Sequence, residues 1–320
     1  MTLTLVLAAC SAAVVSPYTR SGFLSDPSIK TVSQVLEHNE YAVTFNANQS
    51  SEAGSFNLNA AASYLVTDLS VYESDGTIGK SGEKYYLFET HTHVEGSFSI
   101  NGANTASVSD VSSKVYLCGL SDGFKPVYST RTVVSDTPEE KNGALAISKY
   151  SYTITTEYTD GNAKVTVTPA ANVSAENDAL SSEYELENVF ASNYIDNEAL
   201  LFAPRAIALS TSTSLSFNCI DALSKSNNSM SLYYAEIKNV EFEGGSYERK
   251  KEFTERVSSV STIALGLAIN SEYSGSPQKL SFAQSSEAHE YSRLISLSVP
   301  AAYNMGTFEF IIKNSTISFN

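Results

Sequence analysis

The dominant pattern along the chain is an alternation of apolar and polar side chains with a period of two. It is clearest between residues 84 and 100, where a β-strand would sort the side chains onto two opposite faces. One face would carry Tyr86, Phe88, Thr90, Thr92, Val94, Phe98 and Ile100. The other face would carry Glu89, His91, His93 and Glu95. This segment is typical of an antiparallel sheet with one face against a core and the other in water.

Turn signals divide the chain into further strands. Asp122-Gly123, Asn142-Gly143 and Asp160-Gly161 separate or flank alternating runs, and such pairs favour the positive φ angles of tight hairpins. They predict a meander of antiparallel strands. The expected strands cover residues 41–45, 64–72, 84–100, 114–118, 127–134, 150–158, 164–168, 215–220, 232–242, 257–269, 279–282, 294–299 and 307–317.

Two regions depart from this alternation and predict helices. Asp26 and Pro27 are typical of a helix start, and apolar residues from Ile29 to Leu36 recur at helical spacing, so a helix is expected to end near residue 38 or 39. Residues 180–209 also lose the period of two. Asp196 could cap a helix there, and Pro204 should kink or end it. The expected fold is mainly β with a few helices: a curved antiparallel sheet or unclosed β-barrel, an N-terminal helix and a helical insertion.

The first ten residues carry a different signal. Leu3 to Ala9 form an apolar run that is too short to cross a bilayer, which needs about 20 residues. Small residues then precede a cysteine, as at the cleavage point of a secretory signal. Leu7-Ala8-Ala9-Cys10 resembles a bacterial lipobox. The resemblance implies that Cys10 is lipidated and becomes the mature N-terminus, on the extracytoplasmic face of a bacterial membrane.

These features predict the domain organisation. Residues 1–9 would be a lipoprotein signal truncated at its start, since no Lys or Arg precedes Arg20. Residues 10–26 would be the lipidated cysteine and a tether, and residues 27–320 a single large β-rich domain. A chance apolar N-terminus is the alternative to the signal.

The amino-acid composition mainly excludes classes of binding partner. The formal net charge is -15, so the sequence offers no basic stripe for nucleic acid, and the acyl chains would provide the attachment to the membrane. The sequence has three cysteines. Cys118 and Cys219 are expected as buried free thiols, although a disulfide between them stays open. A monomer without a cofactor is expected.

The whole plan resembles extracytoplasmic lipoproteins of the half-barrel type, such as the lipoprotein-carrier (Lol-like) superfamily. The residues that carry the likeness are Asp196-Asn197-Glu198-Ala199-Leu200-Leu201 with Arg205, and Gly306-Thr307-Phe308-Glu309-Phe310. In that superfamily a curved sheet wraps around helices and leaves an apolar concavity. The resemblance implies that the chain binds or carries a hydrophobic or cell-envelope ligand.

Two candidate sites follow from the residues. Glu89, His91, His93 and Glu95 would lie about 6.6 Å apart at each second position of one strand face, where His-x-His could chelate a metal; a solvated face is the alternative. Arg205 stands among apolar residues, where it could pair with a carboxylate such as Glu198. If it faced an apolar groove instead, it could bind an anionic head group.

Three functions compete on this evidence. The first is a membrane-anchored lipoprotein with a lipid or envelope ligand in the hollow of a curved sheet. The second is a surface protein that binds a polysaccharide or a protein partner on a flat Tyr-rich face, with a filled core. A hydrolase ranks third, because the sequence shows no Gly-x-Ser-x-Gly motif and no locatable acid–base pair. We therefore expect no enzymatic activity and no catalytic residues. The ligand, the partners and the metal content stay open.

Overall fold

The computed structural model describes residues 35–51, 53–119, 122–242, 247–250, 254–269, 277–284, 286 and 292–318. The described strands are β1 (Val35–Ala47), β2 (Ser55–Leu58), β3 (Tyr64–Glu73), β4 (Lys84–Ile100), β5 (Ala103–Leu117), β6 (Pro126–Lys141), β7 (Ala144–Thr159), β8 (Asn162–Pro169), β9 (Ser182–Leu186), β10 (Ser214–Asp221), β11 (Ser226–Glu241), β12 (Tyr247–Lys250), β13 (Thr254–Val257), β14 (Ser259–Ile269), β15 (Gln278–Ala283), β16 (Leu294–Pro300) and β17 (Gly306–Ile317). The helical pieces are α1 (Ala175–Asp178) and the 3-10 turns η2 (Val189–Ala191), η3 (Asn197–Ala199), η4 (Ala203–Ala206) and η6 (Ala302–Asn304).

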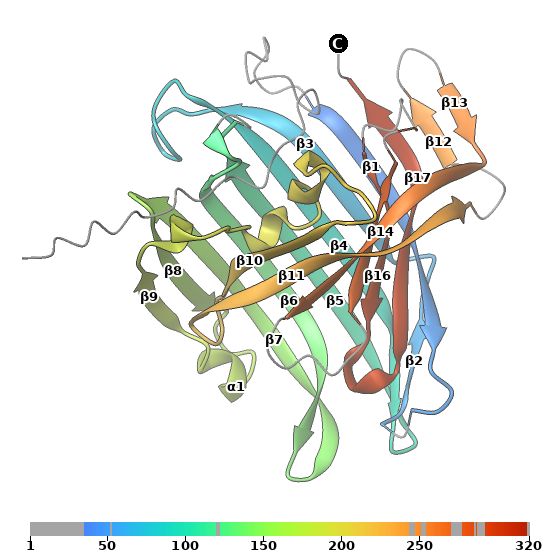
Figure 1. The fold of residues 1–320 in the computed structure, drawn as a ribbon. Helices are drawn as coiled ribbons and strands as arrows, with labels where there is room; N and C mark the ends of the chain where they lie inside the picture. Colours follow the sequence, from blue (N-terminus) through green and yellow to red (C-terminus); the bar gives the residue numbers. More distant parts are fainter. Residues whose placement is uncertain are drawn as a thin grey trace, which may run out of the picture.

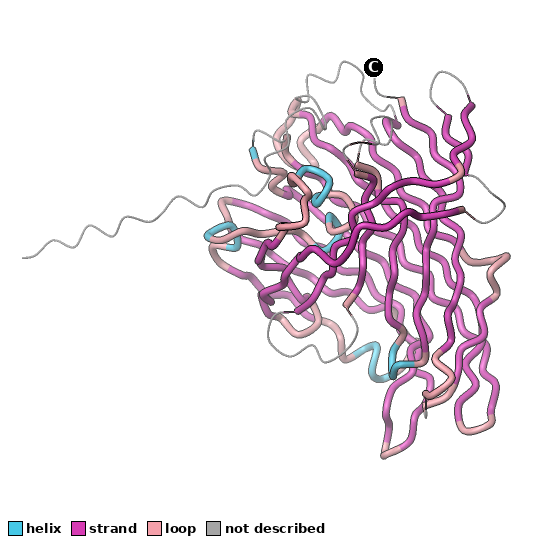
Figure 2. Tube along the Cα trace, turned by 45° about the vertical axis from the view of Figure 1, so that its right-hand side comes forward, coloured by secondary structure: helices cyan, strands magenta, loops and turns pink. Residues whose placement is uncertain are grey.

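All of these strands belong to one sheet. Its main path runs β9-β8-β7-β6-β5-β4-β3-β1-β17-β16-β15-β14-β11-β10, and every neighbouring pair on this path is antiparallel. β2 extends the sheet beside the far end of β4, and β12 pairs in parallel with β17. The sheet curves so strongly that β10 and β11 pass in front of β4 to β7 (Figure 1; Figure 2 shows the same arrangement turned by 45°). The prediction of a mainly β, curved antiparallel sheet is confirmed.

The expected N-terminal helix is wrong over the part that the structure describes. Val35 and Leu36 belong to β1, and residues 27–34 lie outside the described residues. β1 is an interior strand, paired with β17 on one side and β3 on the other. Its ladders join residues that are far apart in sequence, and such tertiary pairing overrides a local helical spacing of apolar residues.

The predicted insertion at 180–209 is only partly helical. It contains β9 and then three short 3-10 turns, η2, η3 and η4. Asp196 caps η3 as predicted, and Pro204 stands in the first turn of η4. The turns pack inside the curved sheet. Phe202, with no exposed surface, stacks on Phe88 of β4 at 5.2 Å between ring centroids and lies 5.6 Å from Phe124.

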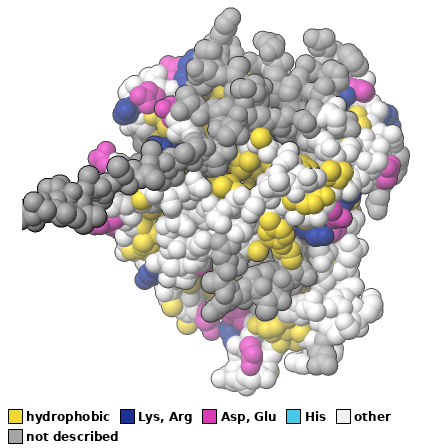
Figure 3. Space-filling model, in the orientation of Figure 1, with side chains coloured by type: hydrophobic (Ala, Val, Ile, Leu, Met, Phe, Trp, Pro, Cys, Tyr) yellow, Lys and Arg dark blue, Asp and Glu magenta, His cyan; other side chains and the backbone are white. Residues whose placement is uncertain are grey.

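The inner face of the sheet holds the main core. Its apolar residues come from strands all along the path, from Leu65 on β3 to Phe282 on β15, and from the turns η3 and η4. On the face shown in Figure 3, backbone and uncharged polar side chains cover much of the described surface, with separate apolar patches and scattered charged side chains. Among the described residues, no helix has the length and apolar character needed to cross a membrane.

The two ends of the sheet, β9 and β10, approach each other without forming a ladder. A single parallel bridge joins Tyr194 to Asn218 of β10, and the Tyr184 hydroxyl of β9 donates to the Ala222 carbonyl at 3.2 Å. A second, smaller core fills this region, which we call the seam; it contains Val165 and Val189. The barrel is therefore unclosed, and residues 187–196 occupy the gap.

Candidate functional site

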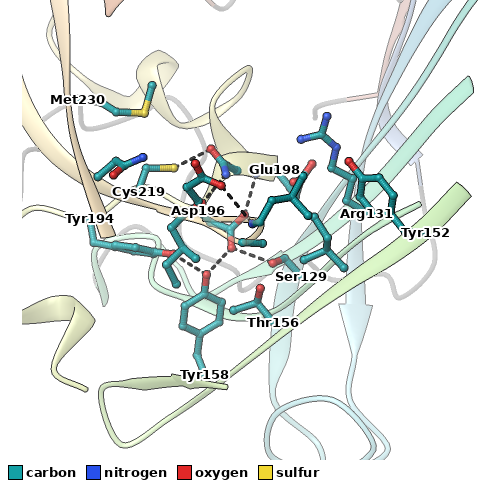
Figure 4. Close-up of a pocket in the computed structure, with 17 residues that line it drawn as sticks. Ser129, Arg131, Tyr152, Thr156, Tyr158, Tyr194, Asp196, Glu198, Cys219 and Met230 are labelled. Atoms are coloured by element: carbon teal, nitrogen blue, oxygen red, sulfur yellow. Dashed lines mark hydrogen bonds between the residues drawn. The ribbon is translucent and has the colours of Figure 1, made fainter. Parts of the chain in front are cut away.

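A polar hollow of about 310 Å³ opens beside the seam. Figure 4 shows its walls: Arg131 and Tyr152 stand on one side, and Met230, Cys219 and Tyr194 on the other. β6 and β7 supply one wall because alternate residues of a strand share a face. The register places Ser129 opposite Thr156 and Arg131 opposite Ile154, so all four point to the same side of the sheet.

Asp196 is the centre of the hydrogen bonds in the polar hollow. Its Oδ2 accepts from the Ser129 hydroxyl at 2.8 Å and from the Tyr158 hydroxyl at 2.5 Å (Figure 4). Its Oδ1 accepts from the backbone N–H of Glu198 at 2.7 Å. Since Tyr158 gives its proton to Asp196, the Tyr194 hydroxyl donates to the Tyr158 oxygen across 2.6 Å. Both oxygens of Asp196 are thus engaged in holding η3 and the tyrosines in place.

Burial shifts the titration of these groups. It raises the pKa of Tyr158 and of Tyr194 well above the ordinary value, and the Asp196 charge adds to the effect. Burial also raises the pKa of Asp196, although the hydrogen bonds from Tyr158, the Glu198 backbone and Ser129 work in the opposite direction. The tyrosines therefore stay neutral donors at physiological pH.

Glu198 and Arg131 are two of the charged residues that line the polar hollow, together with Asp196 and Asp221. Burial raises the pKa of Glu198 to about 7, against the opposing charge of Arg131 and with a smaller contribution from Asp196. Arg131 comes from the inner face of β6. Within the described residues, no group accepts a hydrogen bond from its buried Nε. A buried donor of this kind calls for a partner, which a bound ligand can supply.

A second, apolar hollow of about 420 Å³ lies further along the same inner face. Its lining is rich in aromatic and aliphatic side chains from β2, β4, β5, β16 and β17. Phe56 and Phe98 pack at 4.9 Å between centroids, and Phe56 also packs on Phe308 at 5.4 Å. Its volume and that of the polar hollow fall at the lower end of the roughly 300–1,000 Å³ of ligand pockets.

The two hollows share Arg131. Along β6, Ser129 and Arg131 line the polar hollow, whereas Arg131, Ser135 and Thr137 line the apolar one. Arg131 sits in a cross-strand row with Ser113 and Thr90, whose hydroxyls are 2.8 Å apart. This polar row therefore marks the boundary between an acidic, tyrosine-rich hollow and an apolar one.

Arg205 lines neither hollow. It is 3 % exposed and forms a bidentate ion pair with Glu37 of β1, with Nη1 and Nη2 at 2.8 and 2.7 Å from the carboxylate oxygens. Burial alone would raise the pKa of Glu37, but Arg205 and then Arg293 outweigh it, so that pKa is lowered. The predicted pairing of Arg205 with a carboxylate is confirmed, but its partner is Glu37 rather than Glu198. The hypothesis of a head-group ligand at Arg205 does not fit this burial.

The predicted face of β4 is present, but its four polar residues contact neighbouring side chains, and the two histidines share one carboxylate. His91 Nε2 and His93 Nδ1 lie 3.0 and 2.8 Å from Asp110 Oδ2. Glu89 pairs with Lys114 at 2.7 Å, and Glu95 accepts from Asn59 at 3.0 Å. The described residues contain no group of three or more His, Cys, Asp or Glu that could hold a metal ion. The face is a solvated network of pairs.

The cysteines divide into three cases. Cys10 and the tether lie outside the described residues. Cys118 and Cys219 are free thiols, as expected, although Cys118 is only half-buried. Cys219 lines the polar hollow and donates to Asn197 Oδ1 at 2.7 Å.

Sequence reasoning missed the polar hollow. The alternation of Tyr152, Ile154, Thr156 and Tyr158 placed them on one face, but it did not say which face points inward. Asp196 drew attention as a helix cap only. The hollow joins side chains from β6, β7, η3, β10 and β11, whose proximity depends on the closing of the sheet.

Comparisons with known proteins identify no family. No protein-family model matches the sequence, and no curated protein matches it. A solved structure from Brucella abortus, described as a beta-barrel-like protein of a domain of unknown function (DUF1849), is similar with a TM-score of 0.46. The identity is 9%, and the match covers 91% of this chain and 100% of that chain.

Proposed function

We propose that the protein binds the single acyl chain of an amphiphilic cell-envelope ligand in the apolar hollow of its curved sheet. The observation that carries the proposal is the apolar hollow of about 420 Å³, which is lined by Phe56, Phe98 and Phe308 and shares Arg131 with the lining of the polar hollow. Burying an apolar chain there gains roughly 25 cal/mol per Å² removed from water.

The proposal concerns binding rather than turnover. Hydrolysis by a carboxylate pair needs two carboxyl groups that can reach the substrate. In the polar hollow, both oxygens of Asp196 already accept hydrogen bonds from Ser129, Tyr158 and the Glu198 backbone. That arrangement favours a fixed binding surface.

We also propose an extracytoplasmic location with anchoring through Cys10. The support is the lipobox-like Leu7-Ala8-Ala9-Cys10. Two acyl chains on one cysteine give stable attachment, whereas one chain gives marginal attachment. Intact mass of the protein from membranes should show a diacylglyceryl group on Cys10, and Cys10→Ser should release the protein from the membrane fraction. A native N-terminus that retains Met1 would contradict the anchor.

The apolar hollow can be tested with a fluorescent reporter, because the chain contains no Trp. Phe98→Trp places one indole in the hollow, and Val134→Trp places one on the outer face, where Val134 is 45% exposed. A lysophospholipid brominated on its acyl chain should quench the first indole saturably and leave the second unchanged. Equal quenching of both variants, or of neither, would contradict the proposal.

A blocking variant gives an independent test. Ser109 lines the apolar hollow, and its neighbour Val108 is 38% exposed on the opposite face of β5. Ser109→Trp should lower the affinity for the brominated lipid at least about tenfold by filling the space, whereas Val108→Trp should not. Lipid mass spectrometry of the purified native protein would then identify what it carries.

One observation favours the second candidate function, a surface for polysaccharide or a partner protein. Tyr72, Tyr116 and Tyr128 form an edge-to-face row across β3, β5 and β6, with centroids 5.0 and 5.9 Å apart. However, Tyr116 is only 8% exposed, so the ring in the middle offers little surface. This function also predicted a filled core, which the two hollows do not match.

A further inference from the structure

The inference concerns the polar hollow and its boundary with the apolar one, and it rests on the proposed binding of an acyl chain. The described lining of the polar hollow includes three carboxylates, on Asp196, Glu198 and Asp221, and one basic side chain, on Arg131. Tyr152, Tyr158 and Tyr194 also line it. Carboxylates beside aromatic rings attract a cation, both by charge and by the ring quadrupole.

Arg131 has the opposite preference. Arg131 lines both hollows, and its buried Nε has no acceptor among the described residues. A guanidinium suits phosphate and carboxylate oxygens, since it donates several hydrogen bonds in a planar fork. The order along the inner face is thus an apolar surface, a cation and then a group of anions.

We propose that the protein recognises a zwitterionic single-chain amphiphile: the acyl chain in the apolar hollow, a phosphate at Arg131 and an ammonium beside Glu198 in the polar hollow. A lysophospholipid with an ethanolamine head has these groups in this order. Asp196 has a positioning role, because its oxygens hold Tyr158, Ser129 and the turn that carries Glu198.

One geometric and one electrostatic feature support this assignment. Ser113, which lies beside Arg131 in the cross-strand row, also interacts with Glu198, so both charged residues adjoin the same residue of β5. The raised pKa of Glu198, about 7, results mainly from burial. A ligand ammonium would offset that burial by stabilising the ionised form.

The test compares lysophosphatidylethanolamine, lysophosphatidylglycerol and an alkylammonium with the same chain length. The full-length chain with Phe98→Trp reports binding of each by displacement of the brominated lipid. The ethanolamine lipid should bind about tenfold or more tightly than either of the others, since each lacks one charge-assisted contact. The preference over the glycerol lipid should grow between pH 6 and pH 8 as Glu198 ionises.

Variants assign the two charges. Glu198→Gln should bring the affinities for the ethanolamine and glycerol lipids to within about threefold and remove the pH dependence of their ratio. Glu95→Gln, on the outer face of β4, is the matched control and should leave the ratio unchanged. Arg131→Met should weaken both lysophospholipids about tenfold and leave the alkylammonium unchanged, whereas Lys114→Met on the outer face of β5 should affect none of the three.

The outcomes separate the inference from the proposed function. Equal binding of all three probes in the native background would overturn the head-group assignment and leave chain binding in place. An unchanged ratio in Glu198→Gln, with thermal melts that show a folded protein, would overturn the role of Glu198. If no probe displaces the brominated lipid and that lipid does not quench the indole, chain binding itself is contradicted.

Discussion

The same curved sheet encloses two combinations of an arginine and a carboxylate with very different surroundings. Arg205 and Glu37 are 3 % and 2 % exposed and meet in a bidentate contact. Arg131 and Glu198 face a hollow, and Glu198 has a raised pKa where Glu37 has a lowered one. The first pair joins the inserted turns to β1, so its role is structural. The second has charges that a ligand can use.

The difference comes from partners rather than from residue type. Asn39 donates to Glu37 Oε1 at 2.7 Å, and Arg293 adds a further charge to the contribution of Arg205. For Glu198, the charge of Asp196 raises the pKa further, and the charge of Arg131 opposes the rise. A buried charge is stable when paired and hydrogen-bonded, and otherwise its pKa shifts towards the neutral form. Pairs that look alike in composition can therefore be separated by the direction of their pKa shifts.

The largest expected effect breaks the structural pair. Arg205→Met should lower the free energy of unfolding by about 3–5 kcal/mol, because it leaves the Glu37 charge buried without its main partner. Urea denaturation at pH 7 measures the change. Adding Glu37→Gln should restore part of the loss, and Lys114→Met, which breaks a surface pair with Glu89, should cost less than about 1 kcal/mol. Similar losses for Arg205→Met and Lys114→Met would show that burial does not distinguish the pairs.

The next prediction concerns how the free energy of unfolding depends on pH through Glu198. The pKa of Glu198 rises from 4.5 to about 7 on folding, so the native state binds the proton more tightly and stability falls as the pH rises across that window. Glu198→Gln removes this cost. It should stabilise the protein by about 3 kcal/mol at pH 8 and by nearly nothing at pH 4, where the carboxyl is mostly protonated in both states. Urea titrations at the two pH values test this, and equal gains at both would contradict it.

A smaller effect is expected at Tyr158, which contacts both Asp196 and Tyr194 in the polar hollow. Tyr158→Phe removes the donor to Asp196 and the acceptor for Tyr194, and should cost about 1–3 kcal/mol because two buried polar groups lose a partner. Thermal unfolding measures it. Tyr72→Phe is the control, since its hydroxyl makes an exposed contact with Asp75 at 3.4 Å. A neutral result for Tyr158→Phe would mean that water replaces the lost contacts.

The smallest effect concerns the outer face. The pKa of Asp110 is lowered: burial opposes the change, but the hydrogen bonds from His93 and His91 prevail. Its contribution is present above the ordinary pKa of 3.8 and is lost as the pH falls through the lower folded value. Because the side chains of Asp110, His91 and His93 are 39%, 42% and 22% exposed, water screens the contacts and Asp110→Asn should cost less than about 1 kcal/mol at pH 6. The loss should shrink further in 1 M salt, and a loss of several kcal/mol would contradict a surface role.

Local chemistry predicted much of the fold. The alternation along β4 correctly placed Phe88 inward and His91 outward, and Asn142-Gly143 and Asp160-Gly161 take the positive φ angles that two-residue hairpins require. These features depend on neighbours in sequence. The helical spacing before Leu36 failed because β1 pairs with β3 and β17 along its length.

The site could not be predicted in the same way. Glu37 and Arg205 stand 168 positions apart, and nothing local links them. Glu198 and Arg131 line the same hollow because η3 packs against β5 and β6 inside the curved sheet. Such proximity is a property of the path of the whole sheet, whereas periodicity reports only the faces of single strands.

Among the described residues, the seam is the place on the sheet path where the two facing edges share the fewest backbone hydrogen bonds. Between other neighbours on the sheet path, separation would break a ladder of backbone hydrogen bonds, as along β4 and β5, where fifteen residue pairs are in register. Across the seam, β10 instead contacts residues 192–197 through the Tyr194–Asn218 bridge and a few side-chain hydrogen bonds, and β9 adds the contact from the Tyr184 hydroxyl to the Ala222 carbonyl. The two ends of the sheet are thus joined by a short segment and by individual side chains, where other neighbouring strands share a continuous ladder of backbone hydrogen bonds.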